Sequence, residues 1–232
     1  MKQSTKTELL NFLESFISEN KKELFKKTIE YRTRYITVVL EDIFQPHNAS
    51  AVLRTCDCFG IQDVHIIENR NLYEVNPDVA LGSSKWLTLT KYNTRENNTL
   101  DTINKLKSDG YTIIATTPHK NDTPLNQLDL SKKTALLFGT ELNGLSDIAI
   151  ENADGFVKIP MYGFTESFNI SVSAAIILHQ LTDKLRESEH CWQLTENEKL
   201  DIRLDWARNV VKKSELAEEE FLSRKIHNNN KL

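Results

Sequence analysis

The sequence predicts an α/β fold, with a mostly parallel sheet, helices on both faces of the sheet, and helical extensions at both ends of the chain. Apolar, β-branched runs alternate with stretches of helical spacing throughout residues 35–187. The run "YITVVLE" is continuously apolar, as the buried strands of parallel sheets are. The flanking segments are helical in pattern and charged. We therefore expect an N-terminal helical extension at 1–34, the α/β domain at 35–187 and a C-terminal helical extension at 188–232.

The N-terminal extension is predicted to hold one or two amphipathic helices within residues 5–31. The apolar residues at helical spacing are Leu9, Leu10, Phe12, Leu13, Phe16, Ile17, Leu24, Phe25 and Ile29. The stretch 20–35 is also the one clear concentration of positive charge, with six basic and two acidic residues. It fits either a solvated helix face or an arm that contacts phosphates.

The α/β domain begins with a predicted strand at 35–41. A helix follows, and we expect Asn48, just behind Pro46, to be its N-cap. A second strand is predicted at 63–67. Residues 85–92 alternate between apolar and polar side chains, which is typical of an edge strand.

The second half of the domain continues the same alternation of strands and helices. The elements expected there are a helix at 99–110 ending at Gly110, strands at 111–117 and 134–139, a short helix at 146–153 capped by Ser146, a strand at 155–160, and a long helix at 169–187. Strands separated by helices favour parallel pairing over hairpins.

Composition bounds the class of protein. The chain has 232 residues, of which 39% are hydrophobic and 27% charged, as expected for a globular protein with a proper core. The formal net charge of −4 excludes a globally basic nucleic-acid binder but leaves room for a local basic patch. The N-terminus has no signal-peptide pattern, and the longest apolar run, "AAIIL", is too short to span a bilayer. We therefore expect a cytoplasmic protein without a membrane partner.

Several common ligand sites are excluded by their missing motifs. The seven glycines make neither the dinucleotide fingerprint GxGxxG nor the P-loop pattern GxxxxGK[ST]. The chain also lacks HExxH, paired CxxC and GxSxG. Its three cysteines, Cys56, Cys58 and Cys191, make neither a disulfide framework nor a zinc site. No metal is expected.

Three loops are left as candidates for a site. "PHNASAVLRT", "FGTELNGLS" and "IPMYGFTESFN" each follow an apolar strand and place small or polar residues before a helix. Their candidate side chains are those of Asn48, Arg54, Glu141, Ser167 and Asn169. These supply amides, a cation, a carboxylate and a hydroxyl, but no serine–histidine–carboxylate arrangement. The set favours transfer chemistry over hydrolysis by a triad.

Together these segments resemble the SpoU (TrmH) family of RNA ribose 2′-O-methyltransferases. "NASAVLRTCDCFGI" is similar to the family's first motif, "LLFGTELNGLS" to its second and "IPMYGFTESFNISVSAAIIL" to its third. The motifs come in the family's order, and the match covers about residues 20–190. "PHN" and "GSSKW" resemble the TrmH subgroup, which methylates a guanosine ribose at tRNA position 18. In the third motif, Glu166 departs from the subgroup's usual pattern and adds a negative charge.

The resemblance implies a deep trefoil knot at the C-terminal end of the sheet, which is an exception to the rule against knots. It implies that S-adenosylmethionine binds in the knot, held mainly by backbone groups. The cofactor site would be lined by Thr116, Gly139, Ile159, Met161 and Phe168. The family is dimeric, so a homodimer through the knot helices is implied. The alternative for the apolar run "SVSAAIIL" is a helix buried within one monomer.

The resemblance also places the catalytic role on Arg54. A guanidinium has a pKa above about 12 and is a poor proton acceptor. Our hypothesis is that Arg54 grips the neighbouring phosphate in a bidentate manner and uses it to draw the proton from the ribose hydroxyl. We expect its side chain to lean toward Asn48.

Each of the other candidate site residues has a functional and a structural interpretation. Asn48 would position Arg54 or the ribose, or would serve only as an N-cap. Glu141 would orient the arginine or bind across the dimer, or would be an ordinary turn carboxylate. Ser167 and Asn169 would fix the substrate end of the site, or would cap a helix. The expected RNA contacts are His47, which could also be a turn residue, and Lys26, Lys27, Arg32 and Arg34.

Three functions are compared on this basis. The first is a tRNA guanosine-18 ribose methyltransferase that uses S-adenosylmethionine and acts on tRNA. The second is a ribose methyltransferase acting on rRNA or on the tRNA anticodon loop. The third is a catalytically silent RNA-binding module, which the presence of all five candidate catalytic residues disfavours.

Overall fold

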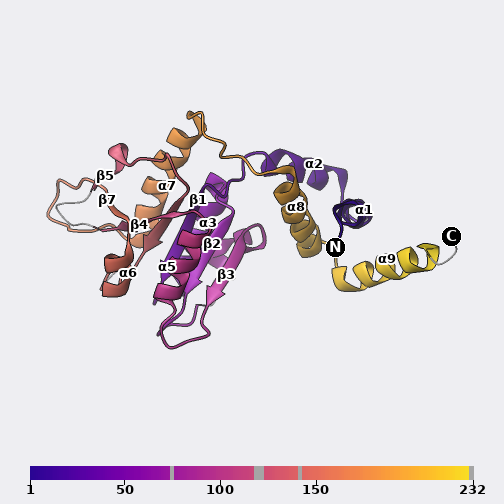
Figure 1. The fold of residues 1–232 in the computed structure, drawn as a ribbon, viewed down its shortest axis with the longest axis horizontal. Helices are drawn as coiled ribbons and strands as arrows, with labels where there is room; N and C mark the ends of the chain where they lie inside the picture. Colours follow the sequence, from indigo (N-terminus) through magenta and orange to yellow (C-terminus); the bar gives the residue numbers. More distant parts are fainter. Residues whose placement is uncertain (74–75, 118–122, 141–142, 230–232) are drawn as a thin grey trace. The chain divides into compact units, whose positions relative to one another are not determined.

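The computed structural model describes residues 1–73, 76–117, 123–140 and 143–229 of the chain. Contacts within the chain define two compact units (Figure 1). Thr33–Trp192 form the catalytic unit, and Met1–Arg32 with Gln193–Leu232 form the terminal unit. The two chain ends, which we expected as separate extensions, thus belong to one unit.

The catalytic unit contains a parallel sheet, which confirms the predicted fold class. In the described part of the chain the sheet has seven strands in the order β3-β2-β1-β6-β4-β7-β5, and each pairing is parallel. Its strands are β1 (Ile36–Glu41), β2 (Asp63–Ile67), β3 (Thr88–Tyr92), β4 (Thr112–Thr116), β5 (Thr123–Pro124), β6 (Thr134–Phe138) and β7 (Gly155–Lys158). The strand expected at 85–92 lies at the edge, as predicted, but starts at Thr88 because Ser83–Lys85 form a 3₁₀ turn, η1.

Helices cover both faces of this sheet. α3 (Pro46–Phe59) packs on α7 (Ile170–Arg186), and α5 (Thr99–Ser108) packs on α6 (Asp147–Asn152). Successive residues of β1 belong to different cores, since Val38 and Leu40 pack with α3 and α7 whereas Val39 packs with α5 and α6. Alternate residues of a strand point to opposite faces, so both faces are buried. A short helix, α4 (Pro77–Ala80), also contacts α3.

The expected N-cap of α3 is wrong. The helix begins at Pro46, with Gln45 in the cap position. Proline suits the first helical position because its missing N–H has no partner there anyway and its φ is already helical. Asn48 therefore lies within the first turn, is buried, and donates to Gln45 Oε1 at 3.0 Å. By contrast, Ser146 caps α6 as predicted and accepts from the Ala149 N–H at 3.1 Å.

The terminal unit is built from four helices in its described residues. They are α1 (Gln3–Glu14), α2 (Glu19–Ile29), α8 (Glu196–Val210) and α9 (Ser214–Asn229). α1 packs on α8, and Arg203 of α8 donates to Glu14 of α1 at 2.6 Å. α8 begins with a capping box between Thr195 and Glu198, which fixes its first turn.

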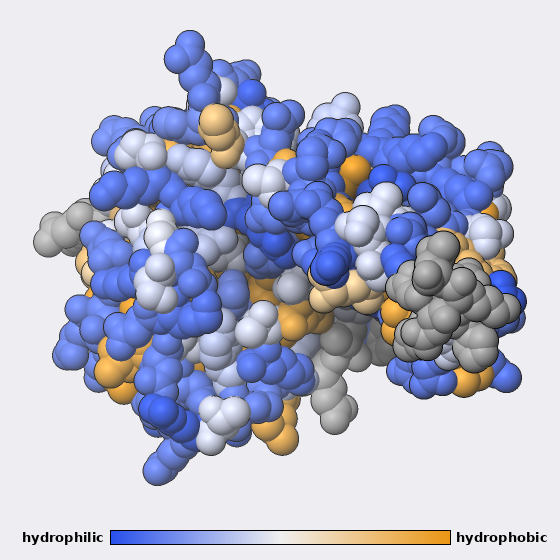
Figure 2. All heavy atoms as spheres, turned by 45° about the vertical axis from the view of Figure 1, so that its right-hand side comes forward, coloured by the Kyte–Doolittle hydropathy of each residue, from blue (hydrophilic) through white to orange (hydrophobic). Residues whose placement is uncertain are grey.

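The surface is consistent with the composition. Hydrophilic residues predominate on the face drawn in Figure 2, and hydrophobic residues are scattered among them. None of the helices in the described residues combines the length and the hydropathy needed to cross a bilayer.

Candidate functional site

A cavity of about 410 Å³ lies in the catalytic unit where β4, β6 and β7 end. Ligands of open parallel sheets bind outside the carboxyl ends of the strands, so its position is that of a ligand site. All five residues expected to hold the cofactor line it, although they come from three separate stretches of sequence. They are Thr116, Gly139, Ile159, Met161 and Phe168.

One wall of the cavity is the cavity loop, which we define as the described residues Gly139, Thr140, Asn143, Gly144 and Leu145. Thr140 and Gly144 exchange two backbone hydrogen bonds of 3.0 Å. A Cβ on Gly139 would lie 2.2 Å from the Gly144 carbonyl carbon, so this position accepts only glycine. The loop is therefore closed tightly on itself.

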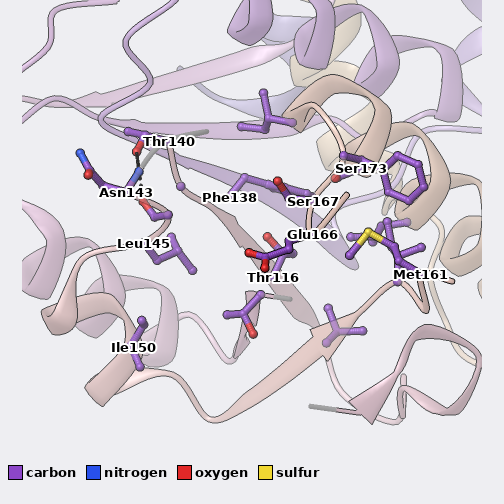
Figure 3. A pocket seen from close by; sticks show the side chains of 18 residues that line it. Thr116, Phe138, Thr140, Asn143, Leu145, Ile150, Met161, Glu166, Ser167 and Ser173 are labelled. Atoms are coloured by element: carbon purple, nitrogen blue, oxygen red, sulfur yellow. Dashed lines mark hydrogen bonds between the residues drawn. The ribbon is translucent and has the colours of Figure 1, made fainter. Parts of the chain in front are cut away.

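The opposite wall comes from the segment between β7 and α7. Figure 3 shows Met161, Glu166 and Ser167 of this segment at the cavity, across from Thr140, Asn143 and Leu145 of the cavity loop. Glu166 is the one charged side chain among the described lining residues. A single carboxylate among described lining residues that are otherwise uncharged favours a ligand with positive charge.

The first and third motifs meet at a pair of asparagines. Asn169 Nδ2 donates to Asn48 Oδ1 at 3.2 Å, which joins the start of α7 to the start of α3. Asn169 is also the N-cap of α7, since its Oδ1 accepts from the Ser171 N–H at 2.8 Å. Asn169 therefore combines the capping role with a contact to the other motif. Ser167, two residues earlier, lines the cavity.

Arg54 lies on the exposed side of α3, whereas Asn48 is buried. The guanidinium of Arg54 makes no hydrogen bond or ion pair to another residue that the structure describes. His47, at the start of the same helix, is also exposed. Glu141 lies outside the described residues.

The basic residues expected to contact RNA fall into different environments. The expectation for Arg32 is wrong, because this side chain is buried, with its guanidinium 5.4 Å from the Trp206 ring centroid in the terminal unit. Arg34 pairs with Asp63 at 3.0 Å. Lys26 and Lys27 are exposed on α2, Lys26 within 2.7 Å of a glutamate one turn earlier.

Sequence reasoning missed several polar residues of the cavity. Thr140 and Asn143 lie in the cavity loop, and Ser173 lies in the first turn of α7. The two loop residues flank Glu141 in the second motif, where the carboxylate alone stood out as a candidate. The sequence could have identified them by position, because any polar residue directly after a buried parallel strand lies at the carboxyl end of the sheet, where ligands bind.

In the described residues, no group of three or more histidine, cysteine, aspartate or glutamate side chains is arranged to hold a metal ion. The arrangement instead combines an amide pair, an exposed cation and a glycine-lined cavity. The sequence profile of the SpoU rRNA Methylase family matches residues 35–179, which is more than half of the chain. The chain belongs to the SpoU methylase family.

Individual members of the family are similar over most of the chain. The tRNA (guanosine(18)-2′-O)-methyltransferase of Borreliella burgdorferi is 47% identical over 209 residues, covering 90% of this chain and 94% of that protein. The crystal structure of the A. aeolicus TrmH/SpoU tRNA modifying enzyme matches with a TM-score of 0.75 and 30% identity, covering 84% of this chain and 98% of that one.

A second structure supports the fold alone. The SpoU methyltransferase AviRb of Streptomyces viridochromogenes, in complex with the cofactor AdoMet, is 20% identical with a TM-score of 0.57. The match covers 70% of this chain and 62% of that one. The chain is thus an α/β methyltransferase of the SpoU family, and relatives of its fold bind S-adenosylmethionine.

Proposed function

We propose that this protein is a tRNA (guanosine-18-2′-O)-methyltransferase that uses S-adenosylmethionine. The observation that carries the proposal is the 47% identity, over 90% of this chain, to a relative that bears this name. The A. aeolicus tRNA modifying enzyme, which matches along 98% of its own length, supports the same substrate class. The substrate is then the ribose 2′-hydroxyl of a guanosine in the D-loop, and the protein works in the cytoplasm, where tRNA is found.

The cavity suits S-adenosylmethionine in size and charge. Its volume of about 410 Å³ falls within the range of small-molecule sites. S-adenosylmethionine, when bound, supplies a methyl group activated on a positively charged sulfonium. Glu166 offers the complementary charge, and Gly139 lets the cavity loop close against the backbone of Gly144. The residues that would hold the cofactor are Thr116, Gly139, Ile159, Met161 and Phe168.

Arg54 is proposed to act on the RNA rather than on the cofactor. Its exposed guanidinium can hold the phosphate beside the target ribose through two parallel hydrogen bonds. The phosphate oxygen then lies near the 2′-hydroxyl and draws its proton, a task for which the guanidinium itself is too weak a base. Asn48, fixed by Asn169, holds the start of α3 in place. Ser167 and Asn169 are proposed to fix the substrate end of the site, and Glu141 is proposed to orient Arg54 or to bind across the dimer.

The tRNA is proposed to contact both units. Lys26 and Lys27 on α2, with Arg34 and His47 in the catalytic unit, supply positive or hydrogen-bonding side chains for phosphates. Arg32 is left out because it is buried.

Two further features are proposed from the family resemblance. One is a trefoil knot at the C-terminal end of the sheet. The other is a homodimer through α7. Exposed apolar side chains on α7 and just before it, at Val172 and Phe164, support an interface over a helix buried in a monomer. Sedimentation of twice the chain mass is the expected result.

The function is tested by methyl transfer from labelled S-adenosylmethionine to an unmodified tRNA transcript. Nuclease mapping is expected to find 2′-O-methylguanosine at position 18. Label at the anticodon or only on ribosomal RNA would keep the family chemistry and overturn the substrate. Cofactor binding without transfer to either RNA would favour a silent RNA-binding module.

A further inference from the structure

Glu41 is a buried carboxylate at the carboxyl end of its strand, which is the end of the sheet at which the cavity lies. It does not line the cavity itself. It is the last residue of β1 and is 3% exposed. Its Oε1 accepts from Thr99 Oγ1 at 2.6 Å and from Ser146 Oγ at 2.7 Å, and its Oε2 accepts from the Ser146 N–H at 2.9 Å. No basic side chain pairs with it in the part of the chain described. Three neutral donors therefore offset the cost of burying this charge.

Two of these three bonds hold the far end of the cavity loop. Ser146 directly follows Leu145, which lines the cavity and packs in the core under α5 and α6. Ser146 is also the N-cap of α6, so its backbone N–H precedes the helix and has no partner within it. Glu41 thus fixes the junction at which the cavity loop becomes α6.

The Glu41 side chain is itself held from the other side. Thr99 begins α5, is fully buried, and accepts from Asn69 Nδ2 at 2.9 Å while it donates to Glu41. The carboxylate therefore has a fixed position between α5 and the cavity loop. Both of its oxygens act only as acceptors. A glutamine of the same shape would present one acceptor and one NH₂ group, and so could not satisfy all three donors.

We propose that Glu41 is a positioning residue for the cofactor cavity. Through Ser146 it holds the cavity loop in the conformation that binds S-adenosylmethionine. The assignment rests on the proposed function, because it concerns the same cavity. It adds a residue of β1 that touches neither cofactor nor RNA.

The test compares E41Q with E68Q. Glu68 is a matched control, because it is also a buried carboxylate, just after the neighbouring strand β2, and it also accepts one backbone N–H, that of Tyr73, at 2.9 Å. Its side-chain donors are Lys91 and Asn93, and none of its partners lines the cavity. Both substitutions disturb a buried carboxylate, but only one disturbs the cavity loop.

The measurements are the Kd for S-adenosylmethionine by calorimetry, the separate KM values for cofactor and tRNA, and the thermal midpoint. E41Q is expected to raise the cofactor Kd and KM about tenfold and to leave the KM for tRNA within about twofold. E68Q is expected to lower the thermal midpoint and leave the cofactor Kd within about twofold. An unchanged cofactor Kd in E41Q, or equal weakening in both variants, would overturn the proposal.

Failure of E41Q to fold would shift the test to Ser146. Ser146→Ala removes the hydroxyl that donates to Glu41, and Ser146→Thr retains one. The alanine variant is expected to weaken cofactor binding and the threonine variant to restore it; no difference between them would overturn the proposal. If the wild-type protein binds no S-adenosylmethionine, the proposed function fails as well. If the wild-type protein binds S-adenosylmethionine and the variants bind it equally well, only the role of Glu41 is overturned.

Discussion

Residues of the same type have different roles in this protein because their environments differ. Arg32 and Arg54 are both arginines in stretches that suggested RNA contact. Arg32 is buried against Trp206 and supports the terminal unit, whereas Arg54 is exposed and unengaged within the described residues. Among the buried carboxylates, Glu68 has a cationic partner and Glu41 is held by neutral donors. Burial and partners, rather than residue type, assign the role.

The bidentate grip of Arg54 on a phosphate is tested by Arg54→Lys. Lysine keeps the charge but replaces the planar fork with a point charge, so it cannot hold two phosphate oxygens in parallel. We expect methyl transfer to fall at least about a hundredfold while the cofactor Kd stays unchanged. The measurement is single-turnover transfer at saturating tRNA. Near-normal turnover in this variant would contradict the bidentate grip.

His65 on β2 gives the protein a predictable acid sensitivity. Burial lowers the pKa of His65 to about 4; the charge of Asp109 acts in the opposite direction without reversing the shift, and the charge of Lys105 adds slightly to it. Its ring lies 3.0 Å from the Tyr92 hydroxyl. The unfolded chain takes up a proton near pH 6.5, whereas the folded chain stays neutral down to about pH 4. Stability is therefore lost as the pH falls through this window.

We expect the wild-type protein to lose about 2 kcal/mol more than His65→Gln between pH 7 and pH 5, from about 1.4 kcal/mol for each pH unit below 6.5. The glutamine variant can keep a hydrogen bond to Tyr92 but does not titrate. Urea unfolding at the two pH values measures the difference. Equal losses in the two proteins would mean that His65 is not held neutral.

At the scale of the elements, the sequence predicts those helices and strands whose formation depends on residues that are neighbours along the chain. The apolar runs locate β1, β2, β4, β6 and β7, and the spacing of apolar residues locates α5 and α7. β5 has two residues and no such run, so nothing local predicts it. The N-cap of α3 lies three residues before the expected one, at Gln45, because Pro46 is as good a first helical residue as Asn48 is a cap.

The same distinction between local sequence pattern and long-range contact applies to the residues of the candidate site. The five residues that the family resemblance proposes for the cofactor lie in one cavity. The burial of Arg32 depends on Trp206, which lies far away in the sequence, so no local pattern could reveal it. The network around Glu41 likewise joins β1, α5 and α6. Contacts between distant segments are set by the fold and are not visible in any single stretch.

Substitutions of Asn169 can separate its role as the N-cap of α7 from its contact with Asn48. Asn169→Ser keeps an acceptor for the Ser171 N–H but loses the donor to Asn48, whereas Asn169→Ala loses both. We expect the alanine variant to lose about 1 kcal/mol of stability and the serine variant much less. Both are expected to lose at least about tenfold in kcat. A serine variant with wild-type kcat would reduce Asn169 to a helix cap.

At the scale of the whole molecule, cofactor and RNA are assigned to different sets of residues. The cavity lies entirely within the catalytic unit, whereas the exposed lysines of α2 belong to the terminal unit. Binding of the two substrates should therefore respond to different substitutions. The terminal unit is expected to affect the affinity for tRNA and not that for S-adenosylmethionine.

Reversal of charge at Lys26 and Lys27 tests this division. The double glutamate variant is expected to bind tRNA more weakly and to show a salt slope smaller by about 0.7–0.9 for each phosphate that the lysines no longer neutralise. The cofactor Kd should stay unchanged. The matched control is Lys132→Glu with Lys133→Glu, because both lysines are exposed and lie before β6, at the end of the strand away from the cavity. Equal weakening of tRNA binding in both variants would point to net charge alone.

The pairing of the two chain ends in one unit has a consequence for synthesis. α1 and α2 leave the ribosome early, but α8, on which α1 packs, begins at Glu196. At about 5–20 residues per second, translation of the intervening chain takes on the order of 10–30 s. During that time Leu9 and Leu13, which are fully buried in the finished protein, have no final partner. The first helices to emerge are thus among the last to be completed, and a nascent chain that stalls within the catalytic unit would carry an open apolar face at its N-terminus.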